Sequence, residues 1–151
     1  MNTQIIRPPA FQRPSGKLYL ANAQLDLMNT VPTLVIFDAI GAGYNDGIEN
    51  TVTHRITPGV AGFYSMKSIV LLSAVLIDKY FTTEIRISGV SRGQMTVQTC
   101  FNGLISIPTL TDFYFTAADF VELWVTSQNG NHEVDIVAGV ESSFLSVQRV
   151  R

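Results

Sequence analysis

Residues 55–72, with the sequence RITPGVAGFYSMKSIVLL, carry the clearest structural signal in this chain. A short alternating run leads into Pro58 and Gly59, and the aromatic pair Phe63 and Tyr64 then opens a long β-rich run. Proline presets the first backbone angle of a turn, and glycine accepts the positive φ that the next position often requires. A turn of this kind ahead of a period-two segment is typical of a corner between antiparallel strands. The stretch therefore predicts an all-β domain.

Short β-rich runs continue on both sides of this corner, and no segment shows a helical period of useful length. An Asn-Gly pair at 129–130 predicts a hairpin turn over residues 128–131, because it supplies the positive φ angles that tight hairpins need. About ten short strands in succession favour an antiparallel jelly-roll sandwich over alternating β and α units. The main runs, of which the longest is expected to contain a bulge, are residues 18–20, 24–27, 34–37, 52–56, 64–77, 82–88, 95–101, 104–107, 113–115, 121–126, 134–137 and 143–150.

The composition suits one domain and excludes several classes of protein. The 151 residues carry a net charge of −2, so no overall field attracts nucleic acid or a membrane surface. Only 15% of the residues are charged and 46% are hydrophobic, which indicates that the domain either has less surface to solvate or hides part of its surface against partners. Cys100 is the single cysteine, so an intrachain disulfide and a cysteine-based metal cluster are excluded. We expect its side chain to be buried as a small apolar group.

Residues 1–18 differ from the rest of the chain and predict an extended Pro-rich N-terminal arm, followed by a jelly-roll trimerisation domain over residues 19–151. Pro8, Pro9 and Pro14 lie among arginine, glutamine and serine residues, and prolines at this density exclude a helix or a central strand. One alternative is a frayed terminus, and the other is an arm that lies on a neighbouring molecule. The candidate residues for partner binding are Ile5, Ile6 and Phe11 as apolar anchors, with Arg7, Arg13 and Lys17 as charged contacts.

The chain resembles the globular head domain of the first complement component and the related jelly rolls of the tumour-necrosis-factor superfamily. The most specific piece is the Pro-Gly-Val-x-Gly-x-Tyr pattern within residues 55–64. Residues 35–38, 113–123 and 143–147 match further motifs of the family, so the resemblance runs from about Leu25 to Val150. Ala118 stands where the family usually has glycine, and so does Val147. The collagen-like stalk of the complement relatives is absent from this sequence.

The resemblance implies a homotrimer with aromatic and aliphatic side chains around the three-fold axis. The alternative for each aromatic residue is an ordinary place in the core. Strand alternation sends Phe113 and Phe115 to one face and Tyr114 to the other, so the three cannot share one interface. The candidate trimer-interface residues are Tyr64, Tyr80, Phe81, Phe113, Phe115 and Phe144.

Catalytic chemistry finds no support in the sequence. His54 and His132 lie far apart and outside any catalytic motif, and we expect both on the surface. No nucleophile elbow, phosphate-binding loop or dinucleotide fingerprint occurs. Asp46 and Glu49, in the Gly-rich loop 41–47 and just after it, could bind calcium, but their spacing does not fit an EF-hand and solvated acids are the better interpretation. We therefore expect no enzyme activity, no cofactor and no metal.

The leading hypothesis is a virion structural protein, a trimeric phage decoration or cement protein that binds the shell through its base and its N-terminal arm. The start of the sequence lacks the pattern of a secretion signal, so we expect synthesis in the host cytoplasm and a final place on the capsid surface. The expected partners are two further copies of the chain and the major capsid protein, without nucleic acid or membrane. The alternative is a receptor- or glycan-binding head of a phage fibre or other appendage. In that case Trp124 is a possible sugar-stacking residue, although its position within a strand favours the core.

Overall fold

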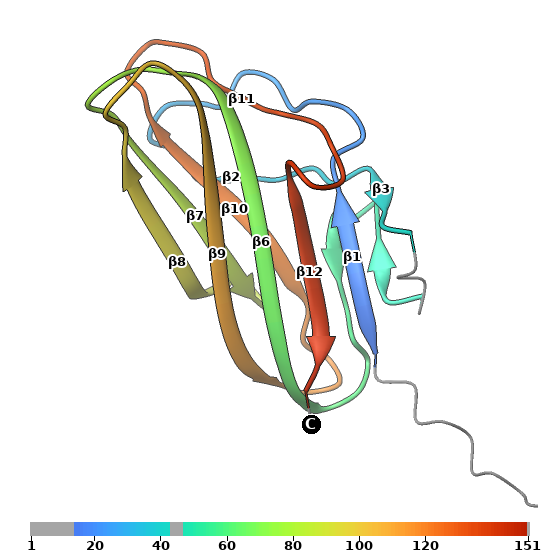
Figure 1. Ribbon diagram of the computed structural model, residues 1–151. Coiled ribbons are helices and arrows are strands. Elements are labelled where there is room, and N and C mark those ends of the chain that lie inside the picture. Colours follow the sequence, from blue (N-terminus) through green and yellow to red (C-terminus); the bar gives the residue numbers. More distant parts are fainter. Residues whose placement is uncertain (1–13, 43–46, 151) are drawn as a thin grey trace, which may run out of the picture.

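Two antiparallel β-sheets pack face to face in the part of the chain that the computed structural model describes, residues 14–42 and 47–150 (Figure 1). These residues form twelve strands and no helix, which confirms the all-β sandwich. With only strands and loops in these two ranges, there is no apolar helix that could cross a membrane.

The first sheet, called sheet A here, has the order β11-β6-β12-β1-β3. One edge of β6 pairs with β12 and, further along, with β11, and its other edge pairs with β9. The two longest strands of sheet A, β6 and β9, run side by side down the front of the sandwich in Figure 1. The strands of sheet A are β1 (Ser15–Tyr19), β3 (Ala39–Ile40), β6 (Gly62–Val75), β9 (Gly103–Phe115), β11 (Asp135–Ile136) and β12 (Phe144–Arg149).

The second sheet, called sheet B, has the order β4-β5-β10-β7-β8, and β2 also pairs with β10. It lies behind sheet A in Figure 1. The strands of sheet B are β2 (Thr33–Leu34), β4 (Glu49–Asn50), β5 (Arg55–Ile56), β7 (Tyr80–Ile87), β8 (Val90–Gln98) and β10 (Val121–Gln128).

The corner at Pro58 and Gly59 carries the chain from β5 in sheet B to β6 in sheet A. Gly59 has φ of 70°, the left-handed conformation for which glycine was expected here. The Tyr64 hydroxyl donates a hydrogen bond of 2.8 Å to the Val60 carbonyl and so closes the corner. The Tyr64 side chain is completely buried, and desolvation raises the pKa of its phenol. The predicted corner is confirmed, and it joins two sheets.

The long strand β6 contains the expected bulge, because its register with β9 shifts between Leu72 and Val75. Ala74, within the bulge, has φ of 58°. Its partner β9 is one continuous strand of 13 residues, whereas the sequence predicted two separate strands at 104–107 and 113–115. The difference arises at Pro108. β9 pairs only with β6, so a proline without an N–H group is tolerated on this edge strand.

The hairpin predicted at 128–131 does not form. β10 ends in sheet B, while β11 pairs with β6 in sheet A, so the turn links the two sheets. Gly130 has φ of 71°, but Asn129 stays outside the left-handed region that a type I′ hairpin needs at both positions. The Asn129 side chain is buried instead, and its carbonyl accepts a hydrogen bond of 3.0 Å from the Leu76 N–H.

Sheet A begins at Ser15, so the predicted boundary of the N-terminal arm at residue 18 is too late. β1 pairs with β12 from Ser15 to Tyr19, and Leu18 is completely buried in the core. Lys17 therefore belongs to the sandwich. The other candidate arm residues, Ile5, Ile6, Arg7, Phe11 and Arg13, lie outside the described residues.

Two predictions of burial are reversed by the structure. Cys100 is exposed, in the short connection after β8. Trp124 points outward from sheet B, because its strand neighbours Leu123 and Val125 fill the core. The core itself is almost entirely apolar, but the hydroxyl groups of Thr83 in β7 and Thr109 in β9 form a buried hydrogen bond between the two sheets.

Candidate binding face on sheet A

The outer face of sheet A carries large apolar side chains at its β9 side. Period-two alternation along β6 and β9 turns Phe63 and Tyr114 outward as a cross-strand pair, and their rings meet edge to face. Leu110 lies on the same face opposite Lys67, and Leu104 lies near the other end of β9. The exposed fractions are 50% for Phe63, 57% for Leu104, 67% for Leu110 and 51% for Tyr114. We call these four residues the apolar strip.

The apolar strip contains none of the six aromatic residues that the sequence proposed for the interface. Tyr64, Phe81 and Phe115 are completely buried within one chain, which was the alternative that the sequence left open. Tyr80 is partly exposed, but it lies on sheet B next to Gln128. An interface on sheet A therefore cannot be made by these four side chains.

The remaining two candidates, Phe113 and Phe144, lie on opposite faces of sheet A. Phe113 is half-buried, and its ring lies 6.2 Å from the ring of Phe115, on the side of β9 that faces the core. The opposite directions predicted for Phe113 and Tyr114 are thus confirmed. Phe144 lies on the outer face of sheet A, outside the core cluster, yet it is only 4% exposed. The Lys17 ammonium covers this ring from 4.3 Å, and that of Lys67 lies 5.8 Å from its centre.

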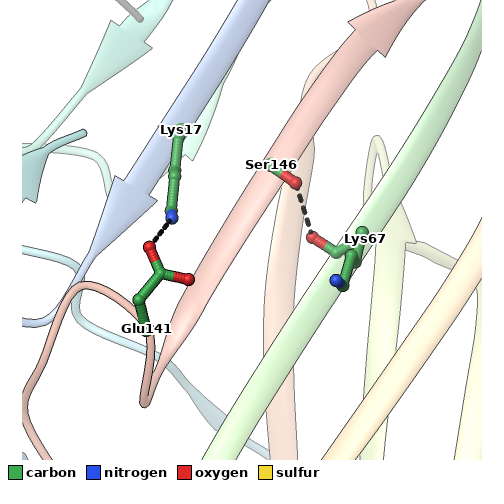
Figure 2. Close-up of polar contacts among 4 residues, drawn as sticks. All are labelled: Lys17, Lys67, Glu141 and Ser146. Atoms are coloured by element: carbon green, nitrogen blue, oxygen red, sulfur yellow. Dashed lines mark hydrogen bonds and ion pairs between the residues drawn. The ribbon is translucent and has the colours of Figure 1, made fainter. Parts of the chain in front are cut away.

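A cavity of about 540 Å³ lies beside this ring. Strand register builds it, since Ser146 of β12 pairs with Lys17 of β1 on one side and with Lys67 of β6 on the other. Figure 2 shows the three residues on adjacent strands. The Ser146 hydroxyl donates a hydrogen bond of 3.2 Å to the Lys67 carbonyl. We call this cavity the lysine pocket; its lining also includes Gly41, Ala42, Val140, Glu141 and Phe144.

The lysine pocket contains two ammonium groups and one carboxylate. Lys17 Nζ lies 2.9 Å from Glu141 Oε1, and the side chains of these residues are 11% and 77% exposed. Across residues 14–42 and 47–150, no carboxylate lies within ion-pair distance of Lys67. Gly41 leaves room for the Lys17 side chain, because a Cβ at Gly41 would approach three of its carbon atoms to 3.0 Å. The pocket therefore carries a net positive charge over an aromatic floor.

The calcium site considered from the sequence has no counterpart in the described residues. Glu49 uses Oε1 to accept a hydrogen bond of 3.3 Å from the Lys17 N–H, and Asp46 lies outside these residues. No group of three histidine, cysteine or acidic side chains is placed to hold a metal within the described ranges. His54 lies in the turn before β5, and its Nδ1 is 2.8 Å from the Phe37 carbonyl. His132 is exposed, as expected.

Trp124 forms a separate polar cluster on the outer face of sheet B. The Arg86 guanidinium lies 4.4 Å from the centre of its ring, and its indole N–H donates a hydrogen bond of 3.2 Å to Glu122. Arg86 also forms an ion pair of 2.9 Å with Glu84. The indole thus has one face against a guanidinium and its polar edge held by a carboxylate.

Two aspartates accept hydrogen bonds that stabilise loops of the sandwich. Asp119 accepts hydrogen bonds from the Thr116 N–H and the Ser88 hydroxyl, and these hold the pKa of its carboxyl below the usual value of 3.8. Burial raises the pKa of Asp38, but hydrogen bonds from Ala21 and Asn22 outweigh it and leave a lowered pKa. Asp119 belongs to the segment that resembles the family motif. Ala118 has no positive φ, so this turn does not need the usual glycine.

The fold is similar to that of murine APRIL in a crystal structure at pH 5.0, with a TM-score of 0.69, 14% identity and coverage of 92% of this chain and 100% of that chain. Eiger TNF from S. frugiperda gives a TM-score of 0.66 and 9% identity, with 92% and 93% of the two chains covered. No protein-family model matches the sequence, and no curated protein matches it either. The described residues thus have a TNF-like jelly-roll fold, which confirms the predicted fold class.

Proposed function

We propose that this chain is a non-enzymatic virion structural protein that assembles as a homotrimer and decorates a capsid. The observation that carries the assembly is the apolar strip of Phe63, Leu104, Leu110 and Tyr114, each at least half exposed on one sheet face. Large apolar side chains exposed together on one sheet face mark a candidate interaction site, although Ser106, Pro108 and Asp112 interrupt this one along β9. The number of subunits follows from the resemblance of the sequence to the complement-head and tumour-necrosis-factor jelly rolls.

An interface made by the apolar strip would involve β9 as the edge strand of sheet A. Leu104, Leu110 and Tyr114 all lie on β9. The edge of β9 that does not pair with β6 lies next to the exposed strand β8 of sheet B. A neighbouring copy that covers this edge shields both apolar side chains and unpaired backbone groups. Obligate interfaces of this type bury more than roughly 2,000 Å² in total.

The proposed attachment to a capsid uses the residues before β1. Residues 1–14 carry Arg7, Arg13 and three prolines, with Ile5, Ile6 and Phe11 as apolar anchors and no acidic residue. Exposed ion pairs contribute only about 0–1 kcal/mol each, so the apolar anchors and the avidity of three arms would supply most of the affinity. The expected partner is the major capsid protein.

A truncation that begins at residue 14 tests this attachment, because it leaves β1 intact from Ser15. We expect the full chain to co-sediment with purified capsids and the truncated chain to bind at least about tenfold more weakly, as loss of multivalent anchoring predicts. Electron microscopy of labelled protein should place it on the outside of the shell. Equal binding by both chains, or a location away from the shell, would refute the proposed attachment.

A glycan-binding head is the second candidate, and the outward position of Trp124 favours it. Sugar-binding sites commonly combine an aromatic platform with polar groups that orient the ligand, and Glu122 and Arg86 are such groups. Glycan-array binding that disappears in Trp124→Ala would support this function. Binding that is unchanged in Trp124→Ala, or the absence of any bound glycan, would exclude this cluster.

A further inference from the structure

We propose that the lysine pocket binds a carboxylate ligand that carries an apolar group. This site is distinct from the apolar strip and does not depend on the proposed attachment to a capsid. It is formed within one chain by β1, β6, β12, the loop before β12, and Gly41 and Ala42 after β3.

The register of three strands places the two lysines around one point. Lys17 and Lys67 flank Ser146 from β1 and β6, so their backbones lie roughly 10 Å apart, two strand spacings. Both side chains nevertheless approach the same ring, since their ammonium groups lie 4.3 and 5.8 Å from the centre of Phe144. The strands thus converge two cations on a single site.

The positive charges of Lys17 and Lys67 are only partly neutralised. Two ammonium groups near one ring repel each other, and only Glu141 lies close enough to neutralise either of them within the described residues. Glu141 contacts Lys17 and is 77% exposed, so a second carboxylate can enter beside it without displacing a buried group. A ligand carboxylate between Lys17 and Lys67 would accept charge-assisted hydrogen bonds, which are the stronger kind.

The lining selects among anions. Phe144, Val140 and Ala42 supply apolar walls beside the lysines, and a small inorganic anion would leave them uncovered. The volume of about 540 Å³ exceeds the needs of such an ion and falls in the range of pockets for organic ligands. Lys17 is held by its ion pair with Glu141 and its contact with the Phe144 ring, so the cationic side of the pocket is preformed. An aromatic or aliphatic carboxylate matches these features.

Such a carboxylate can be free in solution or belong to a neighbouring polypeptide. The pocket opens on the outer face of sheet A, where Lys67 lies directly opposite Leu110 of the apolar strip. A copy seated on the strip could therefore place an acidic side chain in the pocket. The two sources share one chemistry, and the oligomeric state of the protein separates them.

The experiment is titration of the full chain with benzoate, followed by NMR of the backbone amides and by calorimetry. Benzamide serves as the neutral isostere, and inorganic phosphate as an anion without an apolar group. We expect saturable shifts at Lys17, Lys67 and Ser146 with benzoate only. Lys67→Met should weaken benzoate binding by about tenfold or more, the loss of one charge-assisted contact. Lys79→Met, a lysine outside the pocket, should leave it unchanged.

The same titration is repeated with Tyr114→Asp, which is designed to dissociate the assembly and lies opposite Phe63, away from Lys67. Binding to both proteins indicates a free ligand, and binding only to Tyr114→Asp indicates that a neighbouring copy fills the pocket; in the second case Lys67→Met is tested in that background. Binding by neither protein overturns the inference. Equal binding with and without Lys67, or equal binding of benzoate and benzamide, overturns it as well.

Discussion

The rings of Phe63 and Tyr114 meet on the outside of sheet A with their centroids 5.2 Å apart and their planes at 75°. Each side chain stays about half exposed, although the pair sits on the two longest strands of the protein. On the opposite side of the same strands, the neighbouring pair Tyr64 and Phe115 has a similar geometry and is completely buried. One side of sheet A therefore forms the core, and the other exposes an aromatic pair.

Substitution of Leu110 tests the role of the apolar strip. Leu110→Asp places a charge at the most exposed apolar position on β9, so we expect it to weaken self-association by about 2 kcal/mol or more without unfolding the chain. Size-exclusion chromatography with light scattering measures the mass, and circular dichroism checks the fold. Val52→Asp, at an apolar residue that is 85% exposed in a loop, is the matched control and should associate normally. Normal association of Leu110→Asp would exclude the strip.

Removal of one hydroxyl from the buried Thr83–Thr109 pair should destabilise the fold. Thr109→Val leaves the Thr83 hydroxyl buried without its partner, which costs about 1–3 kcal/mol of the free energy of unfolding. Replacement of both threonines by valine removes both polar groups and should recover much of that loss. Urea denaturation measures the parent protein and the two variants. The bridge would contribute nothing if the single and double variants were equally stable.

Asp119 should make the stability depend on pH in the acid range. The pKa of its carboxyl is lowered in the folded state by the Thr116 N–H and the Ser88 hydroxyl, so folding favours the charged form. Its contribution is complete above about pH 5 and is lost as the pH falls through 3.8 and below it. Thermal denaturation from about pH 7 down to about pH 3, which spans this transition, should show a smaller loss of stability for Asp119→Asn than for the parent. An identical pH profile would rule out this role.

Cys100 should react with a thiol reagent in the native protein. Its side chain is exposed after β8, so labelling by an aromatic disulfide needs no unfolding. We expect complete modification at one site without loss of the β-sheet circular dichroism signal. Modification that begins only in denaturant would contradict the exposed position. Cys100→Ser provides the unlabelled control.

Local pattern in the sequence predicted the sandwich well, because turn chemistry and alternation act between near neighbours. Pro58 and Gly59 formed the expected corner, and the alternation of Phe113, Tyr114 and Phe115 was confirmed. The bulge in β6 was also expected. These features depend on backbone angles and on the period of a strand, and both can be read along the chain.

The position of the candidate site depended on information that a single strand does not carry. Alternation separates Phe63 from Tyr64, but only the packing of sheet B shows which of them is covered. Trp124 was expected in the core because it lies within a strand, but strand position does not show which face is covered, and Trp124 lies on the outer face. The lysine pocket joins Lys17, Lys67 and Ser146, which become neighbours only through the pairing of β1, β12 and β6.

The mass of the native protein in solution tests the central claim, that sheet A carries the interface of a homotrimer. Sedimentation equilibrium of the full chain at several concentrations should give three times the chain mass of 16.6 kDa. The measurement needs no partner and no knowledge of the capsid. A mass of one chain at all concentrations would contradict the account, because the apolar strip would then remain open to solvent.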